Sequence, residues 1–188
     1  MISGRDAKGN EEVVKKYMSE GDVYFHADIQ GAAHTIIKSE GRMPGDASRN
    51  EAAVFAAVFS KAWQFRLAAV DVYSVKPEQV SKTAQSGESM GTGAFMIRGE
   101  REWYRKTPLE FAIGYRSKGG AFEVFSGPPD AVKKTADFSL KVSVGAMDKG
   151  DAAKKAFSLL RQNAGGAVPF SLDDIVALLP SGGINIGG

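Results

Sequence analysis

The sequence has no cysteine, only two histidines and no long hydrophobic run. Without cysteine the chain cannot form a disulfide, a thiolate zinc site or a cysteine nucleophile, which fits a protein of the reducing cytoplasm. The longest apolar run, residues 52–59, is far too short to cross a bilayer, and Arg5 and Asp6 stand where a signal peptide needs an apolar core. The sequence therefore gives no indication of a membrane or exported protein.

The chain also has little excess of charge of one sign, because 24 Lys and Arg residues nearly balance 22 Asp and Glu residues. The formal net charge is +2, and the isoelectric point is about 8.7. A chain that wraps nucleic acid without discrimination carries a larger cationic excess. Any contact with RNA must therefore come from a local patch. Acidic residues are then expected to gather away from that patch, on the segments that hold Glu11, Glu12, Asp173 and Asp174.

The composition is that of a globular protein, with 43% hydrophobic and 24% charged residues in 188. Strand and helix patterns follow one another without a regular βαβ rhythm. This predicts an α+β fold, with a mixed or antiparallel sheet packed with helices, plus a small C-terminal α+β appendage. The composition changes at Gly119-Gly120, and we expect a domain boundary between residues 118 and 119.

Hydrophobic spacing predicts the individual elements. A helix is expected at 7–18 with Asp6 as its cap, followed by a half-buried strand at 22–28. Ser48 and Glu51 have the spacing of a capping box, which predicts a helix at 48–66 with Trp63 in its buried stripe. Further strands are expected at 34–38, 68–76, 93–99, 109–116, 121–125 and 138–145, helices at 150–162 and 171–179, and a terminal segment of weak intrinsic order at 181–188.

His26, Asp28 and His34 form the cluster with metal-ligand character. His26 and Asp28 lie two residues apart on one expected strand, and His34 returns after a turn at Gly31. They could bind a metal ion, or they could hydrogen-bond the Gly31 turn and hold two strands in register. We favour the structural role and predict neither metal nor cofactor, because zinc sites normally add a further ligand or an open water position.

Motifs of nucleophilic catalysis are missing from the sequence. There is no Gly-x-Ser-x-Gly elbow, and no motif pairs a serine with either histidine. The segment Gly87-Glu-Ser-Met-Gly91-Thr-Gly93 lacks the Lys-Ser/Thr ending of a phosphate-binding loop, so it predicts only a turn. We therefore do not expect an enzyme. The alternative is a metal-dependent or nucleotide-processing enzyme that uses His26, Asp28 and His34.

The segment 98–106 carries the clearest physical indication of nucleic acid, because cations alternate in it with two aromatic residues. Arginine and lysine can meet phosphates while Trp103 or Tyr104 stacks on an unpaired base. A solvated hairpin whose aromatic residues pack on the core would show the same spacing. The residues predicted to contact RNA are Lys82, Arg98, Arg101, Trp103, Arg105 and Lys106.

Several motifs taken together resemble the RNA-binding region of NFACT proteins of the archaeal and eukaryotic type. They are Gly4-Arg5-Asp6-Ala7 with Asn10-Glu11, Asp22-Val-Tyr-Phe-His26-Ala-Asp28-Ile-Gln-Gly31-Ala-Ala-His34, Ser60-Lys-Ala-Trp63, Gln79-Val-Ser-Lys82-Thr, Gly87-Glu88 and Gly93-Ala-Phe-Met-Ile-Arg-Gly99. The resemblance covers residues 1–118. Residues 119–188 more loosely resemble the small C-terminal domain of the same proteins.

This resemblance implies a role in ribosome quality control, at stalled large subunits that carry a nascent chain, with tRNA and large-subunit ribosomal RNA as partners. In such an RNA-contacting module we expect a pocket shaped by Arg5, Asp6, His26, Asp28 and His34. NFACT proteins normally carry further domains before this region, so we expect a fragment of a longer protein or a stand-alone homologue. The segment 101–108 is basic and aromatic where a more proline-rich turn is expected, so its role is not implied by the resemblance.

Overall fold

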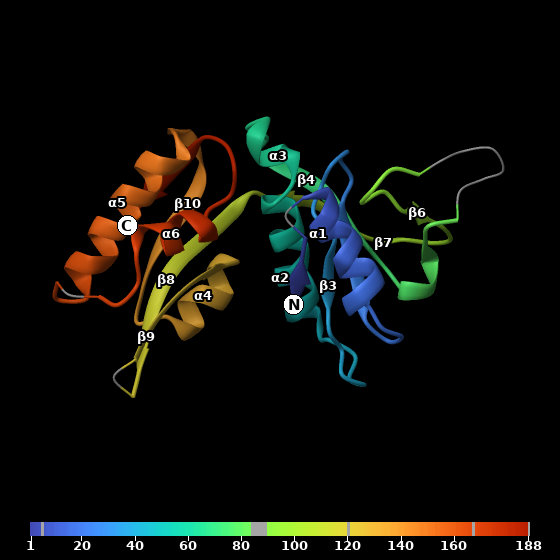
Figure 1. The fold of residues 1–188 in the computed structure, drawn as a ribbon, viewed down its shortest axis with the longest axis horizontal. Helices are drawn as coiled ribbons and strands as arrows, with labels where there is room; N and C mark the ends of the chain where they lie inside the picture. Colours follow the sequence, from blue (N-terminus) through green and yellow to red (C-terminus); the bar gives the residue numbers. More distant parts are fainter. Residues whose placement is uncertain (5, 84–89, 120, 167, 188) are drawn as a thin grey trace. The chain divides into compact units, whose positions relative to one another are not determined.

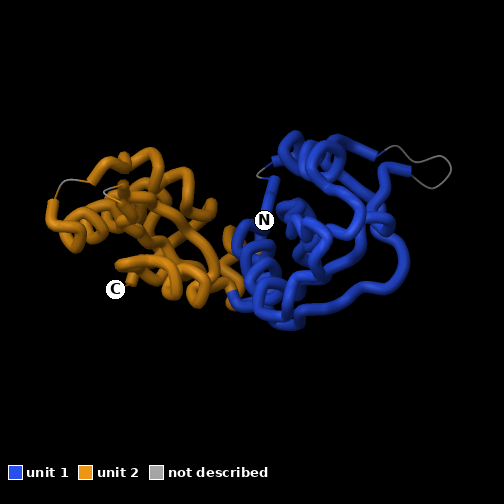
Figure 2. Tube along the Cα trace, turned by 90° about the horizontal axis from the view of Figure 1, so that it is seen from below, with its two compact units in different colours: residues 1–61, 69–108 blue, residues 62–68, 109–188 orange. Residues whose placement is uncertain are grey.

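The structure is a computed structural model that describes residues 1–4, 6–83, 90–119, 121–166 and 168–187. The chain forms two compact units, which Figure 2 distinguishes by colour. Unit 1 comprises residues 1–61 and 69–108, and unit 2 comprises residues 62–68 and 109–188. Each unit has an antiparallel sheet packed with helices, which confirms the predicted α+β class. Within the described ranges, no helix is long and apolar enough to cross a membrane.

Residues 62–68 already belong to unit 2, and the chain passes into this unit for the last time between Pro108 and Leu109, ahead of the boundary expected at 118/119. Strand β8 (Glu110–Lys118) pairs with β9 (Ala121–Gly127) along its length. The expected boundary thus falls at the turn of this hairpin, where Gly119 has the positive φ of 62° that glycine adopts without strain. The assignment of residues 1–118 and 119–188 to two family domains stays a prediction.

Unit 1 is built on a five-stranded sheet in the order β1-β3-β2-β4-β7 (Figure 1). All neighbouring strands are antiparallel. The helix α2 packs against one face of this sheet. The strands are β1 (Ile2–Ser3), β2 (Val23–Ala27), β3 (Thr35–Ile37), β4 (Ala69–Val75) and β7 (Glu102–Pro108).

The opposite face of the sheet is covered by the N-terminal helix and by a small hairpin. The helix expected at 7–18 is an α-helix, α1 (Ala7–Glu12), that continues as one π-helical turn, η1 (Val13–Tyr17). Its expected cap is confirmed, because the Asp6 carboxylate accepts a hydrogen bond from the Gly9 amide at 2.7 Å. The hairpin consists of η2 (Pro77–Gln79), β5 (Val80–Ser81) and β6 (Met96–Ile97).

Strand β2 is buried on both faces, so the prediction of a half-buried strand is wrong. Phe25 and Ala27 are fully buried on the side of α2, whereas Tyr24 packs with Val13, Tyr73 and further apolar residues on the other side. The alternation of side chains along the strand was predicted correctly. The alternation could not show that α1, η1 and the hairpin cover the second face, because that covering depends on contacts distant in sequence.

Strand β7 was expected as a loop or a solvated hairpin. Charged residues occur on both of its faces, so the sequence lacks the apolar alternation that predicts strands. It pairs with β4 as an edge strand, and the register shifts between Val70 and Val72. Edge strands tolerate such charge because one of their sides is not paired within the sheet.

The helix expected at 48–66 consists of two helices, α2 (Asp46–Val58) and α3 (Lys61–Gln64). Because α2 begins directly after Gly45, Ser48 and Glu51 lie inside it, and the predicted capping box is wrong. The break falls where the Ser60 hydroxyl donates to the Ala57 carbonyl at 2.6 Å, a local bond that competes with the helix. The predicted burial of Trp63 is confirmed.

Unit 2 contains a four-stranded sheet in the order β11-β10-β8-β9, with β10 (Phe138–Met147) and β11 (Ile184–Gly187) completing it. The expected C-terminal helices are confirmed as α5 (Lys149–Asn163) and α6 (Leu172–Leu178). Side chains cap both of them: Asp148 accepts from the Asp151 amide, and Ser171 accepts from the Asp174 amide.

Two further expectations for unit 2 are corrected. No helix was expected between the strands predicted at 121–125 and 138–145, but α4 (Pro129–Thr135) lies there, with proline at the helix start where its missing N–H costs nothing. The C-terminal segment was expected to have weak order, yet Ile184 and Ile186 are buried on β11, which pairs with β10. Pairing with β10 supplies the order that the glycine-rich sequence lacks.

Candidate functional site

A pocket of about 460 Å³ opens on the face of the unit 1 sheet that α1 and the hairpin cover. One wall comes from β2 and β4, a second from residues 30–34, and a third from residues 92–97. Its aromatic and imidazole side chains come from five separate segments of the chain. They are Tyr24, His26, His34, Tyr73, Phe95 and, at the margin, Phe59.

His34 is held in place from both sides. Its Nδ1 lies 3.0 Å from the Tyr24 hydroxyl. Its backbone amide donates to the Asn10 side-chain oxygen at 3.0 Å, and the Asn10 amide nitrogen donates to the Ala32 carbonyl at 3.2 Å. Burial lowers the pKa of His34 to about 3, so the ring is neutral at pH 7. Because Nδ1 is engaged with Tyr24, Nε2 is the nitrogen left to meet a ligand.

His26 lies next to His34, with 4.9 Å between the two ring centroids. Burial lowers its pKa to about 4, against weaker upward effects of the Ala27 backbone and Asp28. Its Nδ1 is buried without a hydrogen-bond partner of normal geometry. The expectation that the histidines hydrogen-bond the Gly31 turn is therefore wrong for His26. The ring still lines the pocket, and Nε2 is again the nitrogen available there.

The remaining predicted pocket residues do not all reach this pocket. Asp6 lines it while it caps α1. Asp28 is exposed and lies outside the lining, although its charge is near enough to raise the pKa of His26. Arg5 lies outside the described residues. In the part of the chain that the structure describes, no three His, Asp or Glu residues are grouped to hold a metal ion.

Glu11 anchors the third wall of the pocket. Its carboxylate accepts from Lys82 Nζ at 2.7 Å and from the Gly93 amide at 2.7 Å, and it pairs with Lys15 at 2.6 Å. Hydrogen bonds from Lys15, then Lys82 and Gly93, lower the pKa of Glu11 to about 2. Gly93 approaches α1 so closely that a Cβ would lie 2.6 Å from the Ala7 carbonyl oxygen.

The position of Glu11 corrects the expected charge separation. This acid was expected away from the basic patch, but it pairs with Lys82, one of the predicted RNA-binding residues. The Lys82 ammonium also lies 4.8 Å from the centroid of the Phe95 ring. Lys82 therefore supports the pocket wall, and its charge is largely offset by Glu11.

An arginine–aromatic ladder lies on the pocket face of the sheet. It is formed by Trp103 and Arg105 of β7, by Arg101 directly before this strand, and by Tyr73 of β4. The Arg105 guanidinium lies 3.9 Å from the centroid of the Trp103 ring. The Arg101 guanidinium lies 4.4 Å from the Tyr73 ring and 5.8 Å from the Trp103 ring. Both arginines are exposed, so the ladder offers cationic planes to solvent.

Asp71 fixes the end of the ladder where the β4–β7 register shifts. Its carboxylate accepts from Arg105 at 2.7 Å and from the Lys106 amide at 2.7 Å. Lys106 has a φ of 51°, which is uncommon for a residue other than glycine. Arg98 is exposed and donates to the Thr83 carbonyl at 3.2 Å. No ring or ion-pair contact that is described joins Arg98 or Lys106 to the ladder.

An aromatic row, formed by Trp103, Tyr73, His26, His34 and Phe95, joins the ladder to the pocket. Successive ring centroids are 5.5, 5.8, 4.9 and 5.4 Å apart. Two predicted sets of residues, the basic stretch and the histidine cluster, thus meet on one face of the sheet. The sequence interpretation missed Tyr73 and Phe95, since their pairing with the histidines is set by strand register and by the hairpin.

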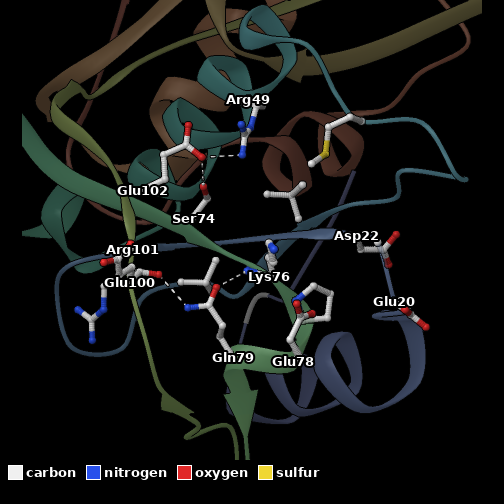
Figure 3. Close-up of a pocket in the computed structure, with 15 residues that line it drawn as sticks. Glu20, Asp22, Arg49, Ser74, Lys76, Glu78, Gln79, Glu100, Arg101 and Glu102 are labelled. Atoms are coloured by element: carbon white, nitrogen blue, oxygen red, sulfur yellow. Dashed lines mark hydrogen bonds and ion pairs between the residues drawn. The ribbon is translucent and has the colours of Figure 1, made fainter.

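A second cavity of unit 1, about 920 Å³ in volume, has a different character (Figure 3). Arg101 stands at its margin, and Arg49 pairs with Glu102 at 2.6 Å. Its acidic residues outnumber its basic ones, which disfavours phosphate. The acids are Glu20, Asp22, Glu78, Glu100 and Glu102, and the bases are Arg49, Lys76 and Arg101.

Comparison with known proteins gives consistent matches. The sequence pattern of the NFACT protein RNA binding domain matches residues 1–99. The archaeal Rqc2 homolog aRqcH of Methanocaldococcus jannaschii is 39% identical over 188 residues, which cover 99% of this chain and 27% of that protein. The ribosome quality control complex subunit NEMF of Homo sapiens is 41% identical over 119 residues, which cover 63% of this chain and 11% of that protein.

Among solved structures, the C-terminal part of the fibronectin/fibrinogen-binding protein from Streptococcus suis aligns with a TM-score of 0.46 at 26% identity, covering 56% of this chain and 39% of that chain. The chain spans about a quarter of the length of its archaeal relative and about a tenth of the human one.

Proposed function

The chain belongs to the NFACT protein RNA-binding domain family, and from this premise we propose that it is the RNA-contacting module of a ribosome quality-control factor. Its proposed partners are tRNA and large-subunit ribosomal RNA, at stalled large subunits that carry a nascent chain in the cytoplasm. The relatives support this role through their names as an Rqc2 homolog and a ribosome quality control complex subunit. We propose no catalytic step for this chain.

The observation that carries the proposal is the arginine–aromatic ladder on β7. Arginine planes and aromatic rings are surfaces on which unpaired bases stack, while the guanidinium groups also attract phosphates. Arg101 and Arg105 are both exposed and lie over the rings of Tyr73 and Trp103. The two arginines are already ordered by these rings, which reduces the entropy that binding would otherwise cost.

The small net charge is compatible with this site, because phosphate contact needs only a local concentration of cations. Arg105 pairs with Asp71 at 2.7 Å, but the arginine is well exposed, so the pair stabilises the fold only weakly and can share its charge with a phosphate. The acidic cavity in Figure 3 bounds the surface on the side of Glu100 and Glu102. The proposed RNA path therefore runs along the ladder toward the pocket.

The test is the salt dependence of RNA binding by the wild type and by the double variant Arg101→Gln/Arg105→Gln. Each phosphate contact on a single strand contributes about 0.7 to the slope of log affinity against log salt concentration, so losing two should flatten the slope by about 1.4. The matched control is Lys133→Gln/Lys134→Gln, which removes the same charge from exposed positions of α4 in unit 2.

The proposal predicts a flatter slope and weaker binding for the ladder variant, with the α4 variant close to the wild type. Circular dichroism establishes first that both variants are folded. Equal slopes for all three proteins would contradict the assignment of the RNA site to the ladder. Testing tRNA and large-subunit ribosomal RNA separately decides which of the two proposed partners binds.

A further inference from the structure

We propose that the pocket beside the ladder receives a single unstacked nucleobase of the bound RNA. This inference rests on the proposed RNA-binding function and adds a division of labour to it: the ladder meets the sugar–phosphate chain, and the pocket takes a base. The pocket volume of about 460 Å³ lies in the lower part of the range of roughly 300–1,000 Å³ that is usual for small-molecule sites.

The walls of the pocket fit a flat aromatic ligand. Ring centroids of His26, His34 and Phe95 follow one another at 4.9 and 5.4 Å, and the rings of each pair are inclined by 81° and 60°. Their faces and edges thus line one concave surface, which is suited to stacking and edge-to-face contact with a base. A phosphate group gains nothing from such walls.

The electrostatics of the pocket also favour a base over a phosphate. Burial keeps His26 and His34 neutral at pH 7, and the charge of Lys82 is offset by Glu11 at 2.7 Å. Asp6 adds a negative charge at the lining. The described residues that line the pocket therefore offer a phosphate no net positive charge, whereas a neutral base would lose little hydration free energy on entering.

The polar atoms of the pocket supply hydrogen bonds for the edge of a base. In neither histidine is Nδ1 available to a ligand. The Nδ1 of His34 is hydrogen-bonded to the Tyr24 hydroxyl, and the Nδ1 of His26 is buried. Each neutral ring therefore offers Nε2, which donates or accepts according to the tautomer. The buried Nδ1 of His26 lacks a hydrogen-bond partner, which raises the free energy of the folded state. A purely structural histidine would avoid this penalty, and such penalties concentrate at functional sites.

The pocket and the ladder are spaced for one strand to use both. Tyr73 belongs to both features, because its ring contacts Arg101 at 4.4 Å and the His26 ring at 5.8 Å. A nucleotide whose phosphate meets Arg101 would thus have its base beside Tyr73, at the entrance of the pocket. The geometry requires the base to be unpaired and unstacked, because in a duplex the partner base occupies its Watson–Crick edge and the neighbouring pairs cover its faces.

The experiment compares a short single-stranded RNA with an abasic strand of the same length, each titrated against three proteins. The wild type should bind the RNA about tenfold more tightly than the abasic strand. In His26→Phe, which keeps an aromatic ring but removes Nε2, and in Ala94→Trp, which fills the pocket from its exposed rim, this ratio should fall well below the wild-type value. The salt slope should be unchanged in both.

A ratio that stays at the wild-type value in both variants would overturn the base pocket while leaving the ladder assignment intact. Equal binding of the two strands by the wild type would overturn it as well. Failure of the wild type to bind any RNA would remove the proposed function and the pocket together. Arg101→Gln serves as the reciprocal control: it should flatten the salt slope and retain the preference for the base-containing strand.

Discussion

The sheets of the two units share antiparallel pairing but differ in what they bury. The unit 2 sheet is aliphatic and aromatic at its centre, with Phe111, Ile113, Leu140 and Val142 almost fully buried. The pocket face of the unit 1 sheet buries His34, Tyr24 and Tyr73 and half-buries His26. Within the described residues, the buried side-chain atoms that lack a hydrogen-bond partner all belong to unit 1; they are His26 Nδ1, Arg49 Nε, Ser81 Oγ and Tyr104 Oη.

This difference indicates that unit 1 is less stable than it could be, because it keeps polar side chains at a surface suited to binding. The core of unit 2 is an ordinary apolar core. Buried polar groups without partners raise the free energy of the folded state by about 1–3 kcal/mol each. Proteins usually keep such groups only where binding uses them.

The largest expected effect is on unit 2, through Trp63→Ala. Trp63 is fully buried, and its Nε1 donates to the Gly183 carbonyl at 3.1 Å, so truncation leaves a cavity and an unpaired carbonyl. We expect a loss of about 3–5 kcal/mol in the free energy of unfolding, measured with denaturant. Trp103→Ala, at a half-buried position of unit 1, should lower the free energy of unfolding clearly less. An equal loss in the two variants would contradict the proposed difference between the units.

The next effect is a pH dependence that belongs to unit 1. The pKa of His26 falls from 6.5 in the unfolded chain to about 4 in the folded one, so the unfolded state takes up a proton first as the pH drops. Stability is therefore complete above pH 6.5 and falls as the pH approaches 4, by on the order of 2–3 kcal/mol.

His26→Phe should flatten this pH profile and leave the protein at least as stable at pH 7, because the variant removes an unpartnered buried nitrogen. Thermal unfolding between pH 4 and 7 measures both effects. A variant whose profile matches the wild type would show that His26 is exposed in solution.

A smaller effect is expected from Asn10→Ala. The Asn10 side chain hydrogen-bonds the His34 amide and the Ala32 carbonyl, both beside the pocket. It also packs tightly on Gly4, where an added Cβ would lie 2.3 Å from the Asn10 side-chain oxygen. Leaving those two backbone groups unpaired should cost about 1–3 kcal/mol in unfolding free energy. Asn50→Ala, on the exposed surface of α2, is the matched control and should change stability little.

The smallest effect concerns Glu11, because its partners Lys15 and Lys82 reach solvent, where water and salt weaken the ion pairs. Its pKa is lowered to about 2 from 4.5, so its contribution to stability is present above pH 4.5 and is lost as the pH falls toward 2. Glu11→Gln should be slightly less stable than the wild type at pH 7, and the two proteins should converge in acid. Urea unfolding at pH 7 and pH 2.5 gives the comparison.

Local sequence patterns predicted most elements correctly, because their signals lie within a few residues. The cap at Asp6, the alternation in β2 and the helices α5 and α6 are of this kind. The failures depend on distant contacts: β11 is ordered by pairing with β10, and β7 is a charged edge strand whose partner is β4. Propensity alone cannot show either pairing.

The candidate site was predictable only in part. His26 and His34 stand out because the chain has no other histidine, and the basic stretch around Trp103 is continuous in sequence. These two groups of residues lie on one face of the sheet because Tyr73 of β4 is paired with His26 of β2 and with Trp103 of β7. That register is set by turn geometry and by the bulge near Asp71, and neither is encoded in the residues that form the site.

The most direct test of the account is to map crosslinks after ultraviolet irradiation of the chain bound to tRNA or to large-subunit ribosomal RNA. The account predicts crosslinked peptides from β4, β7 and residues 92–97, with Tyr73, Trp103 or Phe95 as the modified residue. The aromatic residues of the unit 2 sheet, including Tyr115 and Phe122, should remain unmodified. Crosslinks concentrated in unit 2, with none on the ladder or the pocket, would contradict the central claim that this face of unit 1 contacts RNA.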